Sequence, residues 1–176
     1  MNTPTPRKLF IMNTSPSDAK NFYDIIFIIL VIFREGYITL QQLTRTRVRY
    51  SETDKMGVAY HANYFNWFEM GRSDLCRANG KSFALWEEEG ILLPVVEAHC
   101  RFKSSLFYED EIIIETTISK LSRVSVTFSC KIFNANSNKL AAEGYTKHAF
   151  TSKDGKLLRD GNALESWLNE LLSKNE

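Results

Sequence analysis

Residues 44–64 read T-R-T-R-V-R-Y-S-E-T-D-K-M-G-V-A-Y-H-A-N-Y and pass from a strand pattern through a loop to the start of a helix. Thr46, Val48 and Tyr50 alternate with three arginines, which predicts a half-exposed strand with these three side chains on one face. Gly57 permits a turn in the loop. From Asn63 to Asn79, apolar residues recur at helical spacing and Asn79-Gly80 supplies a stop, so we expect a long helix with a wide apolar face.

Within this helix, Gly71 lowers helix stability, so we interpret it as a position where the long helix approaches another element closely.

The chain after the long helix is rich in strand patterns. Turn residues separate the later strands, which favours an antiparallel sheet. We therefore predict an α+β domain in which five strands cover the apolar side of one long helix. The later elements expected are a short helix over Ser82–Glu89, strands over Leu92–Lys103, Asp110–Ser119, Val124–Phe133 and Lys139–Ser152, and an amphipathic helix over Asn162–Ser173.

The length of 176 residues fits one domain, which we place at residues 44–176 after an N-terminal extension of residues 1–43. Within that extension, the apolar run Phe22–Phe33 is shorter than the roughly 20 residues that span a bilayer, and no cleavage site follows it. We expect the extension to be flexible or to form a short apolar helix, in which the run is either an extra packing helix or a non-native leader, and membrane association is not expected.

The charge balance and the cysteines exclude several classes of protein. Lys plus Arg number 22 against 21 Asp plus Glu, so the net charge of +1 gives no reason to expect a nucleic-acid partner. The three cysteines are widely spaced and odd in number, which argues against a disulfide framework or a zinc cluster. We expect a cytoplasmic protein without a cofactor or a bound metal.

The loop and the helix start combine groups that suit attack on a carbonyl. The N-terminus of a helix presents unpaired N–H groups that stabilise an oxyanion. Asp54 in the loop supplies a carboxylate, which acts either as a nucleophile or as a base on water. Because a thiol with a pKa near 8.5 leaves without a strong acid, these two parts suffice for a thioester.

The motif Arg47-Val48, Thr53-Asp54, Gly57-Val58 and Tyr60-His61-Ala62-Asn63-Tyr64 resembles that of the 4-hydroxybenzoyl-CoA thioesterase family. The sub-branch that it resembles most is the small bacterial acyl-CoA thioesterases associated with the Tol-Pal system, and the likeness extends from about Thr44 to about Ser152. The resemblance implies a hot-dog fold, a five-stranded antiparallel sheet around a long helix, in homodimers or homotetramers with the active site at the subunit interface.

Position in the motif then implies roles for individual residues. Asp54 is the catalytic carboxylate, the backbone N–H at or beside Tyr60 an oxyanion donor, and His61 a polar group that orients substrate or water. Arg123 and Ser125 match a weaker family position for binding the substrate. Ala59 departs from the pattern, where a larger aliphatic residue is commoner.

Simpler interpretations stand beside these roles. A loop aspartate such as Asp54 commonly fixes a turn, and His61 commonly serves as a structural histidine. We expect Glu52 to be solvated and Glu69 and Arg72 to form a structural ion pair. His99 and Cys100 point to opposite faces of a strand, which argues against a Cys-His pair.

The function expected is hydrolysis of an acyl-CoA thioester. Three alternatives remain open at this point: an acyl-carrier-protein thioesterase, a hot-dog hydratase or dehydratase, and a non-catalytic acyl-binding protein.

Overall fold

The computed structural model describes residues 40–159, 161 and 167. The apolar run Phe22–Phe33 therefore lies outside the described residues. So does the helix expected over Asn162–Ser173, apart from Trp167, whose side chain is buried. No helix in the described part of the chain has the length and apolar character needed to cross a membrane.

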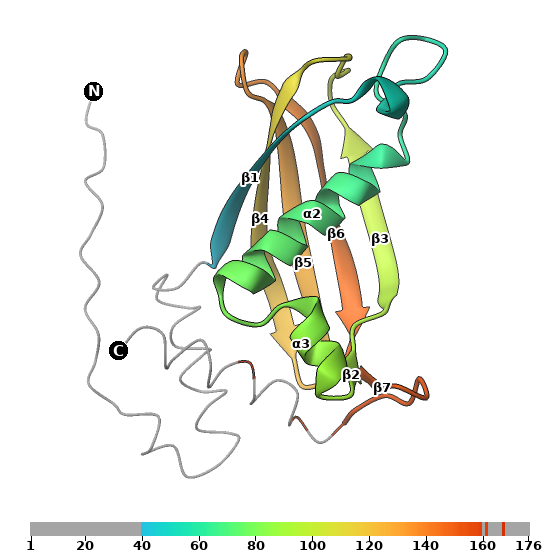
Figure 1. The fold of residues 1–176 in the computed structure, drawn as a ribbon, viewed down its shortest axis with the longest axis vertical. Coiled ribbons are helices and arrows are strands. Elements are labelled where there is room, and N and C mark those ends of the chain that lie inside the picture. Colours follow the sequence, from blue (N-terminus) through green and yellow to red (C-terminus); the bar gives the residue numbers. More distant parts are fainter. Residues whose placement is uncertain (1–39, 160, 162–166, 168–176) are drawn as a thin grey trace, which may run out of the picture. The chain divides into compact units, whose positions relative to one another are not determined.

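The main sheet has five antiparallel strands in the order β1-β4-β5-β6-β3. Both edges are single strands far apart in the sequence, with β1 on one side and β3 on the other (Figure 1). A separate two-stranded sheet pairs β2 with β7. The strands are β1 Gln41–Arg47, β2 Ile91–Leu92, β3 Val95–Phe102, β4 Glu111–Ser122, β5 Ser125–Asn134, β6 Leu140–Ala149 and β7 Thr151–Ser152.

The long helix α2 runs from Asn63 to Ala78 across one face of this sheet (Figure 1). Its buried stripe consists of residues at helical spacing, and it packs on alternate inward residues of the strands. The buried helix residues are Tyr64, Trp67, Phe68, Gly71, Leu75 and Cys76. Facing them on the central strand β5 are Val126, Phe128, Cys130 and Ile132, none more than 2% exposed. The predicted α+β fold, one helix wrapped by a five-stranded antiparallel sheet, is confirmed.

Gly71 marks the closest approach of α2 to the sheet. A Cβ atom at Gly71 would lie 2.2 Å from the hydroxyl oxygen of Thr116 and 2.9 Å from a methyl carbon of Ile114, both on β4. Such distances are far below van der Waals contact, so only glycine fits here without displacing the strand side chains. The expected close approach is confirmed.

The first strand ends earlier than its alternating pattern predicts. β1 stops at Arg47, and Tyr50 begins a 3-10 turn, Tyr50–Glu52, instead of sharing the buried face of Val48. The backbone of Val48 still pairs with Glu109 and Asp110, after which the chain bends into the loop. The Tyr50 ring is 78% exposed whereas Val48 is buried, so the prediction that these two side chains share one strand face is wrong.

Two other predicted strands are each divided in the structure. Pro94 separates β2 from β3, because proline has no N–H to donate to a strand ladder. Phe150 separates β6 from β7 and donates its N–H to Val124 instead. The short helix α3, Phe83–Glu88, lies within the predicted range, and the Ser82 hydroxyl caps it by accepting from the N–H of Leu85.

Candidate active site

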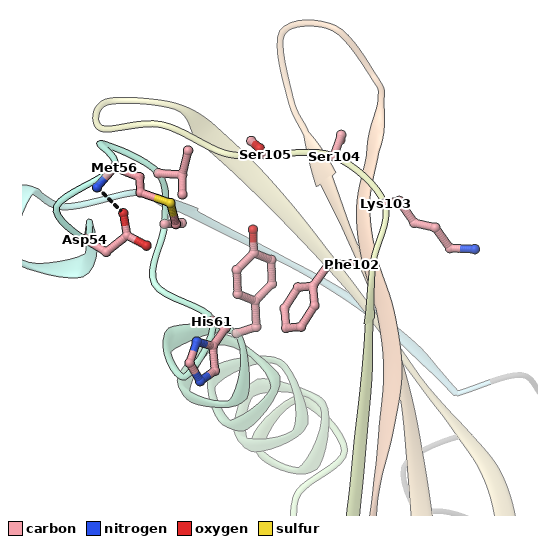
Figure 2. Close-up of a pocket in the computed structure, with 10 residues that line it drawn as sticks. Asp54, Met56, His61, Phe102, Lys103, Ser104 and Ser105 are labelled. Carbon is pink, nitrogen blue, oxygen red and sulfur yellow. Dashed lines mark hydrogen bonds between the residues drawn. The ribbon is translucent and has the colours of Figure 1, made fainter.

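A cavity of about 350 Å³ lies where the loop before α2 meets the end of β3. Figure 2 shows Asp54 and Met56 on the loop, His61 at the helix start, and the segment 102–105 on the opposite wall. Most of the remaining lining is apolar, and the Phe102 ring packs edge-on against the Tyr64 ring with centroids 4.9 Å apart. The cavity therefore combines an apolar wall with one carboxylate. It is lined by Asp54, Met56, Val58, Ala59, His61, Tyr64, Phe102, Lys103, Ser104 and Ser105.

Asp54 begins a tight turn that holds its carboxylate in place. The N–H of Met56 donates to its Oδ1 over 2.8 Å (Figure 2). The N–H of Gly57 donates to the Asp54 carbonyl oxygen over 2.9 Å. Gly57 closes the turn with φ at 77°, a left-handed conformation that favours glycine. Oδ2 of Asp54 has no hydrogen-bond partner among residues 40–159, so this oxygen is available to a ligand in the cavity.

The backbone N–H groups at the start of α2 are not equivalent. The Tyr60 N–H donates to the carbonyl oxygen of Glu52 over 2.8 Å, so it is not free to bind an oxyanion. The N–H groups of His61 and Ala62 have no partner within the described chain. Of the donors expected at or beside Tyr60, the Tyr60 N–H is engaged, and the neighbouring His61 N–H is the first one available.

The side chains of Tyr60 and His61 lie side by side. Their ring centroids are 4.3 Å apart, and Tyr60 is 45% exposed. Of the two, His61 lines the cavity and Tyr60 does not. The Tyr60 ring therefore supports the His61 ring from outside the cavity.

Glu52 is buried, which corrects the expectation that it is solvated. Burial alone would raise the pKa of Glu52, but hydrogen bonds from the Arg49 side chain, the Arg49 backbone and Trp67 bring this pKa below its ordinary value. Arg49 lies only three positions before Glu52, whereas Trp67 lies fifteen positions after it on the helix, so local sequence carries no signal for the indole contact.

Arg123 and Ser125 lie at the other end of the sheet from the cavity. Phe102 beside the cavity pairs with Ala142 on β6, which pairs with Ile132 on β5. Ser125 precedes Ile132 by seven positions on that strand, a distance of about 23 Å at the usual rise per residue. Within one chain, the structure therefore does not bring these two residues to Asp54.

The cysteines and the other histidines do not form a second catalytic set. Burial raises the pKa of Cys100 to about 11, so this thiol is protonated at neutral pH. His99 stacks on Tyr145 at the outer surface of the sheet, while Cys100 packs against the core. No group of three His, Cys, Asp or Glu side chains within the described residues is placed to bind a metal ion.

The opposite wall of the cavity was not predicted from the sequence. Phe102 is 49% exposed at the end of an edge strand, and the pairing of β3 with β6 that places it there is not visible in local periodicity. Ala59, the departure from the family pattern, does line the cavity, where its small side chain leaves more room than a larger aliphatic residue would.

The fold and this arrangement define a hot-dog thioester hydrolase, and comparison with known proteins agrees at the level of the family. The chain belongs to the thioesterase-like superfamily, whose model matches residues 48–171.

Two curated relatives are about 30% identical to this chain over the aligned residues, which make up most of each relative's own length. It is 31% identical to YneP of Bacillus subtilis, provisionally named an acyl-CoA thioesterase, over 68% of this chain and 87% of YneP. It is 29% identical to the acyl-CoA thioester hydrolase YbgC of Escherichia coli O157:H7, over 53% of this chain and 70% of YbgC.

Among solved structures, a DHNA-CoA thioesterase from Staphylococcus aureus superposes with a TM-score of 0.70. The two are 36% identical, and the match covers 77% of this chain and 90% of that one. The hot-dog fold predicted from the motif is confirmed by this likeness.

Proposed function

We propose that this protein hydrolyses the thioester bond of an acyl-CoA, with Asp54 as the nucleophile or the general base. One observation carries the proposal: Asp54, with a carboxylate oxygen that has no partner in the described chain, and His61, with an unpaired N–H at the helix start, line the same cavity. The named activities of YneP and YbgC support the same reaction.

The proposed reaction assigns one task to each part. Asp54 attacks the carbonyl carbon, or removes a proton from the water that does, and the carbonyl oxygen becomes negative. On the first route the acyl group passes to Asp54 as an anhydride, which water then hydrolyses to give the free acid and the original carboxylate. The His61 N–H at the positive end of α2 stabilises that oxygen. The His61 imidazole orients substrate or water, and CoA leaves as a thiolate.

The cavity fits the acyl end of the substrate better than the whole of it. Its volume of about 350 Å³ lies at the lower end of the range for ligand pockets. Met56, Tyr64 and Phe102 offer apolar surface to the acyl group, while the nucleotide of CoA extends outside. Since only the acyl end is enclosed, the same reaction on an acyl carrier protein would differ only in the contacts outside the cavity.

We also propose that Arg123 and Ser125 bind CoA in a homo-oligomer. The edge strand β3 supports such pairing, because all eight of its residues are at least partly exposed and they include the apolar Val95, Val96 and Phe102. The other edge, β1, carries arginines, which protect an edge from pairing. If β3 pairs antiparallel with β3 of a second copy, the Arg123 end of that copy lies at the cavity end of this one.

The proposal also covers the sub-branch of the family and the cellular location of the protein. The motif described above supports placement among the small bacterial thioesterases associated with the Tol-Pal system. A cytoplasmic location is supported by the cysteines, since Cys76, Cys100 and Cys130 are all free thiols.

The test is the release of free thiol from a panel of acyl-CoAs that contains short, long and aromatic acyl groups. We expect turnover with at least one member and no double-bond chemistry. A panel that releases no thiol, or a crotonyl-CoA that is hydrated without thiol release, would contradict the proposal.

A further inference from the structure

Glu52 connects two parts of the site through its side chain. It is 4% exposed, and an acidic side chain is rarely buried so deeply unless it is paired. Its Oε2 accepts the backbone N–H of Arg49 over 2.8 Å, and its Oε1 accepts the Arg49 guanidinium over 2.8 Å and the Trp67 indole N–H over 3.3 Å. Arg49 follows the first strand and Trp67 lies on α2, so one carboxylate joins the strand end to the helix.

The backbone of Glu52 fixes the far end of the same loop. Its carbonyl oxygen accepts the Tyr60 N–H and the Asn63 side-chain amide, each over 2.8 Å. The loop from residue 53 to residue 62 is therefore anchored at both ends to one residue. Asp54 lies two positions after this anchor, and His61 directly follows the N–H that the anchor binds.

We propose that Glu52 is the positioning residue of the site, and that its ionised side chain sets the loop so that Asp54 and the His61 N–H face one point. This inference rests on the proposed function, acyl-thioester hydrolysis. Glu52 does not line the cavity, so its effect passes through Asp54 and His61 and not through contact with the substrate.

Both carboxylate oxygens of Glu52 accept hydrogen bonds, and a glutamine side chain has only one oxygen that can do so. In Glu52→Gln the amide oxygen still accepts one set of donors, but the amide NH₂ cannot accept an N–H. Either the bond to the Arg49 backbone or the bonds at Oε1 are then lost. The loop loses one anchor while the apolar wall formed by Met56, Tyr64 and Phe102 keeps its residues.

The experiment compares Glu52→Gln with Glu69→Gln, a matched loss of charge at an exposed carboxylate on α2 whose ion pair to Arg72 is 3.8 Å long. For Glu52→Gln we expect kcat to fall about 10-fold or more with KM for the acyl-CoA nearly unchanged, because misplacement of reacting groups affects the chemical step. We also expect faster hydrogen exchange at the Tyr60 amide. Glu69→Gln should match the wild type in all three measurements.

A second variant keeps the test valid if Glu52→Gln fails to fold. The Arg49 side chain is 74% exposed, so Arg49→Gln removes the guanidinium bond without disturbing the core. It should lower kcat and speed Tyr60 exchange in the same direction, by a smaller factor.

The outcomes separate this inference from the proposed function. Wild-type kcat and wild-type exchange in both variants would overturn the positioning role, and so would a lower kcat with unchanged exchange. A wild-type protein that releases no thiol, together with faster Tyr60 exchange in Glu52→Gln, would refute hydrolysis and still support Glu52 as the anchor of the loop.

Discussion

Asp54 fits both interpretations of the motif, as an aspartate that fixes a turn and as a catalytic carboxylate. Its Oδ1 fixes the turn by accepting the Met56 N–H, as a loop aspartate commonly does, and its Oδ2 remains available at the cavity. The motif predicted Asp54 and His61 as neighbours of one site. It indicated an oxyanion donor at or beside Tyr60 without distinguishing the two, because the Tyr60 N–H pairs with Glu52, a contact between residues eight positions apart that local pattern does not encode.

Two variants of His61 separate the catalytic role of its backbone N–H from that of its side chain. His61→Pro removes the N–H that is proposed to bind the oxyanion and breaks no recorded hydrogen bond, since this N–H has no partner within the described chain. We expect kcat for thiol release to fall about 100-fold or more, the usual cost of losing an oxyanion donor.

The matched control is His61→Ala, which keeps the N–H and removes the imidazole. It should lose much less activity than His61→Pro, with both variants shown to be folded by circular dichroism. Equal losses in the two variants would mean that the side chain, and not the N–H, does the work.

For the helices and strands, periodicity predicted the type of each element better than the residues at which it begins and ends. The helix predicted over Asn63–Asn79 is observed as Asn63–Ala78, because a 3.6-residue apolar stripe and a stop signal act locally. Strand ends were predicted less well, since they depend on pairing with distant residues. The backbone pairing that continues the first strand ends at Val48, whose N–H donates to the Asp110 carbonyl, so Tyr50, two positions later, lies outside the strand.

A buried histidine on β6 leads to a prediction about pH. His148 is 0% exposed, donates from Nδ1 to the Leu93 carbonyl over 2.8 Å, and accepts at Nε2 from the Thr146 hydroxyl over 3.0 Å. Burial lowers the pKa of His148 from 6.5 to about 4. Between these values the unfolded chain binds a proton that the folded chain excludes, so the free energy of unfolding falls as the pH drops from 6.5 to 4.

The loss from this histidine amounts to about 3 kcal/mol at most. His148→Gln should show a smaller decrease than the wild type when urea unfolding is measured at pH 7 and pH 4.5. The exposed His99→Gln serves as the control and should retain the wild-type decrease. An unchanged decrease in His148→Gln would show that other groups cause the acid sensitivity.

For the whole molecule, the sequence predicted the α+β fold class but not what surrounds the cavity. The wall at 102–105 depends on the pairing of β3 with β6, and the distance of Arg123 and Ser125 from Asp54 depends on the register of three strands. Such long-range pairing is not visible in local periodicity. If Arg123 and Ser125 bind the substrate as proposed, a second copy beside β3 has to supply them.

The oligomer prediction concerns the two edges of the sheet. Val96 on β3 is 56% exposed and Leu43 on β1 is 54% exposed, so a lysine at either position adds a charge to an exposed edge. We expect Val96→Lys to shift the protein from a multiple of the chain mass toward the monomer in light scattering, and Leu43→Lys to leave it unchanged. A wild-type monomer, or a shift caused by Leu43→Lys alone, would contradict pairing through β3.

The central claim, that the Asp54 carboxylate drives thioester hydrolysis, is tested most directly by thiol release from acyl-CoA in Asp54→Asn. The asparagine side-chain oxygen still accepts the Met56 N–H, so the turn and the fold are retained while the nucleophile or base is lost. For Asp54→Asn we predict that kcat falls about 100-fold or more and that the melting temperature is nearly unchanged. Wild-type thiol release from the folded variant would contradict it.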